Sequence, residues 1–251
     1  MSLLDQIAPA PKKVMVLFYL VDTSGSMSGD KIGAVNSAME EAIVSDLPDI
    51  SSANDDADIR VAIMQFASGC SWITPTSGPV AIGDVVWTDL QANGLTDLGA
   101  ACLELDKKLS RHEYLQSITG AYAPVILLFS DGAPTDNWEN GLMTLQENNW
   151  FKNAIKIAIA IGDDAEKGVL AKFTGTSEAV ITVHDKNTLK TLIRKVSVRA
   201  SEFQSHPKTD VIKTPEQESQ DVVKAVITEI KEENVNTDND GSSFDEDWGD
   251  W

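Results

Sequence analysis

Oxygen-bearing side chains follow the first long apolar run of the chain, at a spacing that suits a metal ion. Asp22, Ser24 and Ser26 alternate within the stretch 22–27. They offer only oxygen ligands, which is typical of sites for Mg²⁺, with Mn²⁺ as the second choice. The same residue types also favour turns and helix N-caps, so this short motif alone leaves a purely structural role open.

Two later loops carry hydroxyl or carboxylate groups in similar positions. Thr96 lies in a Gly-containing loop that leads into an expected helix, and Asp131 directly follows the apolar run Val125–Phe129. The first motif likewise follows the unbroken apolar run Val14–Val21, which reads as a strand buried on both faces. In open α/β sheets, ligands bind at the carboxyl ends of the strands, where these loops are expected.

The ordered set Asp22, Ser24, Ser26, Thr96 and Asp131 resembles the metal-ion-dependent adhesion site of the von Willebrand factor type A (VWA) domain. The family pattern is D-x-S-x-S, then a Thr on a later loop, then an Asp after the fourth main strand. The resemblance implies one Mg²⁺ or Mn²⁺, bound directly by the three hydroxyls, with both carboxylates acting mainly through coordinated waters. Such an ion keeps residual positive charge and accepts an Asp or Glu carboxylate from a partner protein.

A narrower similarity connects the chain to bacterial tellurium-resistance-associated VWA proteins. It rests on the stretches Ser130–Asp136 and Ala160–Ala165. This similarity implies a cytoplasmic adaptor in a tellurite or related stress-resistance complex, where a protein kinase or phosphatase is an expected partner. A regulatory partner of a ring-forming ATPase is the alternative within the binding class.

A catalytic role finds little support, so we expect no enzyme. None of the histidines, His112, His184 and His206, lies beside a nucleophile motif, and no G-x-S-x-G, Walker or G-x-G-x-x-G pattern appears. A phosphatase of the haloacid-dehalogenase type needs a second acid two residues after Asp22, and that position is Ser24. A metal-dependent phosphatase is the alternative from a different class, and a scaffold that has lost its metal site is a third reading.

Composition restricts the partners and the compartment. A net charge of −19 argues against binding to nucleic acid or to an anionic membrane, where basic surfaces supply most of the affinity. No apolar run approaches the roughly 18 residues that span a bilayer. Lys12 and Lys13 precede an apolar run as in a signal peptide, but no small-residue cleavage site follows. We expect a buried free thiol at Cys102 rather than a disulfide with Cys70, which fits a reducing cytosol.

Alternating strand and helix patterns predict a three-layer Rossmann-like α/β fold, with helices on both faces of a mostly parallel sheet. The family resemblance adds one short antiparallel edge strand, for which Val85–Trp87 is a candidate. Thr96 or Asp97 is expected to cap one helix, and Asn187 or Thr188 another. Strands are expected at 14–21, 59–66, 125–129, 155–161 and 179–183, and helices at 30–47, 98–109, from 138, 163–173 and 189–196.

The chain divides into three parts by composition. Residues 1–11 are a lead-in, residues 12–201 form the VWA domain, and residues 202–251 form an acidic extension that is expected to be partly disordered. One short helix is expected around 222–230. Eight acids and no Lys or Arg follow Lys231, together with three aromatic residues. Because aromatics among acids are typical of docking segments, a tail carboxylate is also a candidate tethered ligand for the metal.

Overall fold

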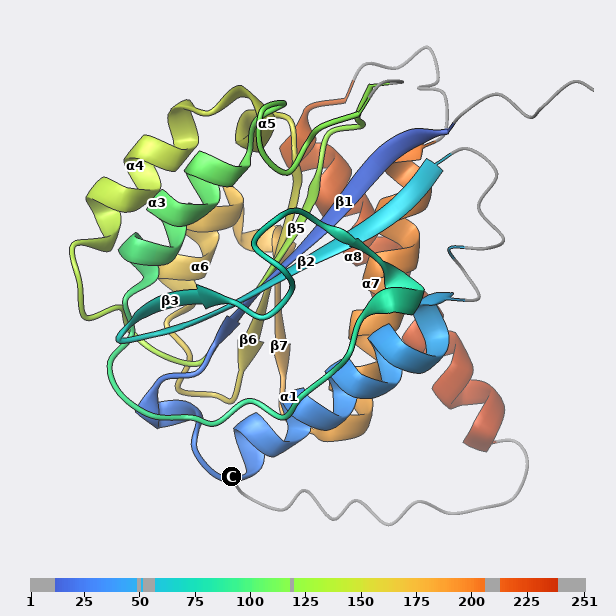
Figure 1. The fold of residues 1–251 in the computed structure, drawn as a ribbon. Coiled ribbons are helices and arrows are strands. Elements are labelled where there is room, and N and C mark those ends of the chain that lie inside the picture. Colours follow the sequence, from blue (N-terminus) through green and yellow to red (C-terminus); the bar gives the residue numbers. More distant parts are fainter. Residues whose placement is uncertain (1–11, 49–50, 52–56, 118–119, 206–212, 239–251) are drawn as a thin grey trace, which may run out of the picture.

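The computed structural model describes residues 12–48, 51, 57–117, 120–205 and 213–238, which build a sheet between two helical layers (Figure 1). Within these residues, the sheet has seven strands in the order β3-β2-β1-β5-β6-β7, with β4 also paired to β2. Strands β1, β2, β5, β6 and β7 are parallel, whereas β3 and β4 run antiparallel to β2. The predicted mostly parallel sheet with helices on both faces is therefore confirmed. The strands are β1 (Lys13–Asp22), β2 (Ala57–Ala67), β3 (Gly69–Trp72), β4 (Val80–Ala81), β5 (Val125–Ser130), β6 (Ile155–Ile161) and β7 (Val180–Val183).

The helices lie on both faces of this sheet. Helices α1, α7 and α8 cover one face, and α3, α4, α5 and α6 cover the other (Figure 1). Helix α1 continues into a π-helical turn over Glu41–Asp46, so the predicted helix at 30–47 is found with a change of winding near its end. The helices are α1 (Asp30–Glu40), α3 (Leu98–Lys108), α4 (Trp138–Glu147), α5 (Asn149–Lys152), α6 (Lys167–Thr174), α7 (Lys186–Ser205) and α8 (Pro215–Asp238).

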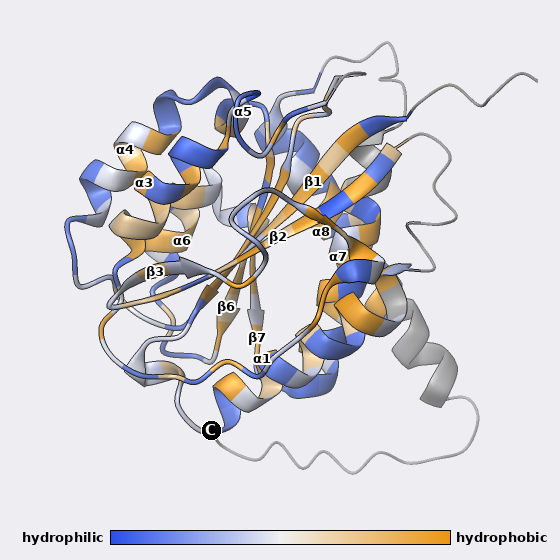
Figure 2. Ribbon diagram, in the orientation of Figure 1, coloured by the Kyte–Doolittle hydropathy of each residue, from blue (hydrophilic) through white to orange (hydrophobic). Residues whose placement is uncertain are grey.

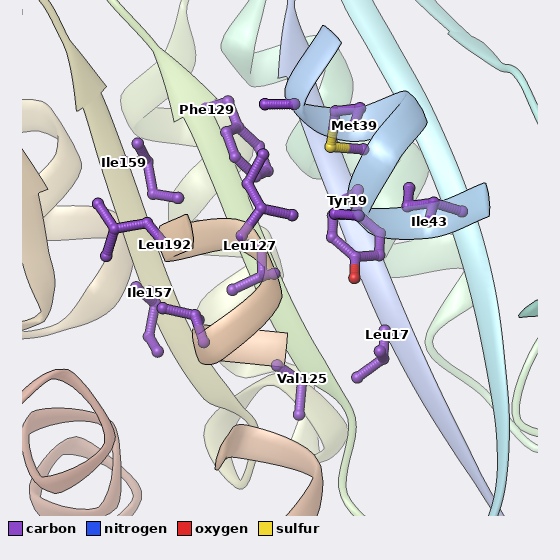
Figure 3. Close-up of a cluster of buried hydrophobic side chains, with 14 of the residues drawn as sticks. Leu17, Tyr19, Met39, Ile43, Val125, Leu127, Phe129, Ile157, Ile159 and Leu192 are labelled. Carbon is purple, nitrogen blue, oxygen red and sulfur yellow. The ribbon is translucent and has the colours of Figure 1, made fainter. Parts of the chain in front are cut away.

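Strand β1 lies at the centre of the sheet because both of its faces are apolar. Every residue from Val14 to Asp22 is buried, and apolar colour concentrates along the central strands in Figure 2. The Tyr19 hydroxyl, which burial would otherwise leave without a partner, hydrogen-bonds Ser197 Oγ of α7 at 2.8 Å. On the face covered by α1 and α7, the side chains that meet are Leu17, Tyr19, Met39, Ile43, Val125, Leu127, Phe129, Ile157, Ile159 and Leu192 (Figure 3).

The predicted strand at Val85–Trp87 is wrong. The antiparallel strands are β3 and β4, and 85–87 is an extended loop without ladder bonds. Val85 and Trp87 pack against the core, whereas Val86 is 84% exposed. An extended loop that lies on a core buries every second side chain, so it shows the same alternation as a strand.

The predicted N-cap position of α3 is confirmed at Asp97, but other residues supply the side-chain caps of both α3 and α7. Asp97 stands at the start of α3, but its carboxylate accepts a hydrogen bond from the Gly69 amide instead, at 2.7 Å. The α3 amides of Gly99 and Ala100 donate to Asp136 at 3.1 and 3.0 Å. Asp136 lies after β5, so the cap depends on tertiary structure.

In α7, the residues expected as caps, Asn187 and Thr188, lie within the helix. Asp185 caps it by accepting from the Thr188 amide at 2.9 Å.

Helix α8 is longer than the short helix expected at 222–230, and it packs on the domain. Val222, Val223 and Val226 are buried in the core cluster that α7 also lines. The Lys156 amide of β6 donates to Ser219 Oγ at 3.1 Å, and the Arg199 guanidinium of α7 donates to Glu229 at 2.6 Å. The acidic, aromatic residues 239–251 and the lead-in 1–11 lie outside the described residues, so the expectations for them stay predictions.

Other sequence-based expectations have simpler outcomes. Cys102 is a buried free thiol, and Cys70 is also free. Across the described ranges, the helices are too short or too polar to cross a membrane.

Helices α3 and α4 are in backbone contact through two glycines. A Cβ on Gly141 of α4 would lie 2.5 Å from the Gly99 carbonyl oxygen and 2.7 Å from the Gly99 Cα of α3. A contact this close leaves no room for a methyl group. The pair fixes α3, which follows Thr96, against α4, which follows the loop that contains Asp131 and Asp136.

We predict that Gly141→Ala destabilises the protein by about 1–3 kcal/mol, because overpacking forces the two helices apart. Urea unfolding followed by circular dichroism measures the change. Gly168→Ala is the matched control, since a Cβ on this α6 residue would have no neighbour within 4 Å. Equal unfolding midpoints for the two variants would refute the tight α3–α4 contact.

Candidate metal centre

The five residues singled out by the sequence lie together at the carboxyl edge of the parallel strands. Asp22 is the last residue of β1, and Asp131 follows the last residue of the neighbouring strand β5. Asp22, Ser24, Thr96 and Asp131 are buried, whereas Ser26 is exposed. The centre therefore has a buried base of two carboxylates and two hydroxyls, and one further hydroxyl at its open side.

A chain of hydrogen bonds connects four of these residues. The Ser24 amide donates to Asp22 Oδ1 at 2.8 Å, and the Ser24 and Ser26 hydroxyls are 3.0 Å apart. The Ser26 hydroxyl then donates to Asp131 Oδ1 at 2.8 Å. Both carboxylates are thus oriented by the hydroxyl-bearing loop between β1 and α1.

Thr96, the fifth residue, joins the others around Gly132. A Cβ on Gly132 would lie 3.2 Å from Ser26 Oγ, 3.6 Å from Thr96 Oγ1 and 4.0 Å from Asp22 Oδ2. Three oxygens from two segments, the loop after β1 and the loop that contains Thr96, therefore line one small space that Gly132, in a third loop, leaves clear. The structure brings all five residues together, and their role as metal ligands stays a prediction.

Backbone hydrogen bonds fix the three loops to one another. The Thr135 amide donates to the Thr96 carbonyl and the Thr96 amide donates to the Thr135 hydroxyl, both at 2.9 Å. On the other side, the Gly25 amide donates to the Gly94 carbonyl at 3.1 Å, and the Asn93 amide to the Thr23 carbonyl at 2.8 Å. The oxygen positions are consequently set by the scaffold before any ligand arrives.

Ser130 is a site residue that the sequence analysis did not assign. Its buried hydroxyl donates to Asp22 Oδ2 at 2.6 Å. The parallel register pairs Val21 with Phe129, so Asp22 and Ser130 come next to each other one residue further on. A serine that ends an apolar strand was the available signal, but the register was needed to interpret it.

Lys31 is the second residue that sequence reasoning missed. Its ammonium lies 2.6 Å from Asp131 Oδ2 and 3.0 Å from Asp164 Oδ1, and its side chain is only 16% exposed. Burial alone would lower the pKa of Lys31, but the hydrogen bonds to the two carboxylates raise it above its ordinary value. Lys31 is therefore a permanent positive charge at the edge of the centre.

The ionised form of Asp22 is disfavoured by its burial in the centre. Burial raises the pKa of its carboxyl above the ordinary value, while hydrogen bonds from Ser130 and Ser24 oppose that shift and the neighbouring Asp131 adds to it. A bound cation would stabilise the ionised form of such a carboxylate.

The donor set fits a hard divalent cation. All candidate ligand atoms are oxygens, and three of the five ligand residues are neutral hydroxyl residues. Among the described residues, no group of three or more His, Cys, Asp and Glu is arranged to hold a metal. His184 instead lies 3.5 Å from Asp163, and His206 lies outside the described ranges. The five candidate residues therefore form an oxygen-rich centre with only two carboxylates, which is suited to binding a hard divalent cation.

The sheet order and this oxygen-rich centre define a doubly wound α/β domain with a ligand site at its carboxyl edge. The family model of the von Willebrand factor type A domain matches residues 17–195, and the chain belongs to that family. No curated protein sequence matches the chain significantly.

Solved structures show the same fold at low sequence identity. Proximal thread matrix protein 1 (PTMP1) from the mussel byssus is 18% identical with a TM-score of 0.56, covering 76% of this chain and 48% of that protein. The ArnB paralog VWA2 from Sulfolobus acidocaldarius is 18% identical with a TM-score of 0.54, covering 74% and 46%. Another PTMP1 structure has a zinc-occupied MIDAS motif; it is 17% identical with a TM-score of 0.54, covering 76% and 48%. The chain thus spans less than half the length of these proteins.

We predict that Gly132→Ala weakens divalent metal binding by at least tenfold while leaving the protein folded. The new methyl group would enter the space lined by Ser26, Thr96 and Asp22, and the backbone of Gly132 does not require a left-handed conformation. Calorimetry with Mn²⁺ measures the affinity, and Gly168→Ala again serves as the control. Unchanged affinity in Gly132→Ala would place the metal elsewhere.

Proposed function

We propose that this chain is a metal-dependent protein-interaction module that binds a carboxylate of a partner protein. The observation that carries the proposal is the convergence of hydroxyl and carboxylate oxygens from three loops around Gly132. Proteins of the VWA family commonly mediate metal-dependent protein interactions. The residues that would hold the ion are Asp22, Ser24, Ser26, Thr96 and Asp131.

The proposed ion is Mg²⁺, or Mn²⁺ as the second choice, because the donor set is oxygen-only. When bound, it would supply a Lewis-acid position for an incoming Asp or Glu. The three hydroxyls bring no charge, so the charge of the ion is compensated only by Asp22 and Asp131 and, more remotely, by Asp164. Three direct carboxylates would leave little attraction for a further acid.

We further propose that the module works without catalysis, in the cytoplasm of a bacterium, as an adaptor in a tellurite or related stress-resistance complex. Support comes from the similarity of the stretch 130–136, whose Ser130, Thr135 and Asp136 all brace the centre. A kinase or phosphatase of that complex is the proposed partner. Regulation of a ring-forming ATPase is the alternative adaptor role, and a metal-dependent phosphatase is the alternative enzyme.

Metal binding should be measurable directly. We predict one Mn²⁺ site by calorimetry, abolished in Asp22→Ala and strongly weakened in Ser24→Ala, because the first variant removes a carboxylate and the second one hydroxyl ligand. Saturating metal should stabilise the fold by about 2.7 kcal/mol at a hundred times its dissociation constant. Asp58→Ala is the control, since this half-exposed acid pairs with Arg60 near the start of β2. A melting temperature that does not change with saturating Mg²⁺ or Mn²⁺, or wild-type affinity in Asp22→Ala, would contradict the proposed metal site.

Partner capture distinguishes the interaction module from the enzyme. We predict that the full chain retains partner proteins from a host lysate only with Mg²⁺ present, and that EDTA, Ser24→Ala or Thr96→Ala each releases them. Lys172→Met, on the helical layer away from α1, should retain them. Metal-dependent hydrolysis of a generic phosphate ester, lost in the same two centre variants, would instead favour the phosphatase.

A further inference from the structure

Lys31 shares a carboxylate with the candidate metal centre. Asp131 Oδ1 accepts from the Ser26 hydroxyl at 2.8 Å, while Asp131 Oδ2 accepts from the Lys31 ammonium at 2.6 Å. The Asp131 side chain is fully buried, so its two oxygens are divided between a candidate ligand hydroxyl and a fixed cation. A metal ion bound near Asp131 would therefore share this carboxylate with the Lys31 ammonium.

The position of the Lys31 ammonium is set from several sides. Lys31 lies in the first turn of α1, and its ammonium also donates to both oxygens of Asp164 at 3.0 and 3.2 Å. A Cβ on Gly162 would lie 3.2 Å from Lys31 Cε and 3.4 Å from Nζ. Gly162 has φ +85°, a conformation that L side chains rarely adopt, so the backbone stays clear for the lysine stem. Lys31 thus connects α1 to the loops after β5 and β6.

We propose that Lys31 is a built-in counter-cation of the metal centre, which neutralises Asp131 in the metal-free protein and keeps metal affinity moderate. This inference rests on the proposed metal binding and adds its regulation. The ammonium partly replaces the charge of the absent ion, so the metal-free protein remains folded. Once a divalent ion enters, the same ammonium is a like charge beside it and weakens its binding. The weaker binding shifts half-saturation of the centre to a higher free metal concentration.

Neutralising Lys31 should remove the repulsion between its ammonium and the metal ion without displacing Asp131. Asp131 is still held by Ser26 and by its burial at the end of β5. Asp164, the other partner, is 69% exposed and becomes solvated without a penalty of burial. Its freed negative charge would add to the attraction for the ion.

The test is calorimetry of Mn²⁺ binding to the full chain with Lys31→Met, which keeps a long side chain against Gly162 but removes the charge. We expect at least tenfold tighter binding, a lower melting temperature without metal and a larger rise on saturation. Lys31→Gln, which can still donate to Asp131, should also bind more tightly and separates charge from positioning.

The control is Lys172→Met, because this lysine pairs with the exposed Glu139 on the other helical layer. It should bind Mn²⁺ as the wild type does. Equal or weaker binding in both Lys31 variants, with normal binding in the wild type, would overturn the counter-cation role alone. Absence of Mn²⁺ binding in the wild type would overturn the proposed function and this inference together.

Discussion

Two carboxylates, Asp22 and Asp131, are held out of water at the ends of neighbouring parallel strands, and the surrounding structure is arranged to satisfy them. Burying ionised groups is costly unless hydrogen bonds or opposite charges compensate. Asp22 receives the Ser24 amide and the Ser130 hydroxyl, and Asp131 receives the Ser26 hydroxyl and the Lys31 ammonium. The remaining need for positive charge is the physical reason to expect a cation at this edge.

The scaffold explains why these groups stay in place. β1 is buried on both faces and pairs with β2 on one side and β5 on the other, so its carboxyl end has little freedom. The α3–α4 glycine contact and the hydrogen bonds between Thr96 and Thr135 hold the Thr96 loop against the loop after β5. A preorganised oxygen cluster loses little entropy when it binds an ion, which makes it suited to recognition by a single added ligand.

The sequence predicted the parts of this design that depend on local pattern. The apolar run of β1 and the hydroxyl and carboxylate residues in three loops were visible because strand burial and loop chemistry leave residue-type signatures. Lys31, Ser130 and Asp136 were not assigned, since their roles come from strand order and register. The alternation at Val85–Trp87 misled because a loop lying on the core shows the same period as a strand. Asp97 was placed correctly at the start of α3, but its side-chain cap, Asp136, comes from another loop, and the cap of α7 is Asp185, one residue before the helix.

The most direct test of the central claim is anomalous diffraction from a crystal of the full chain grown with Mn²⁺. We predict one strong anomalous peak, which marks an ion bonded to the hydroxyl oxygens of Ser24 and Ser26. It should lie beside Gly132 and close to Asp22, Thr96 and Asp131. A well-ordered centre without an anomalous peak at saturating Mn²⁺, or a peak only at exposed acids such as Asp163, would contradict the account.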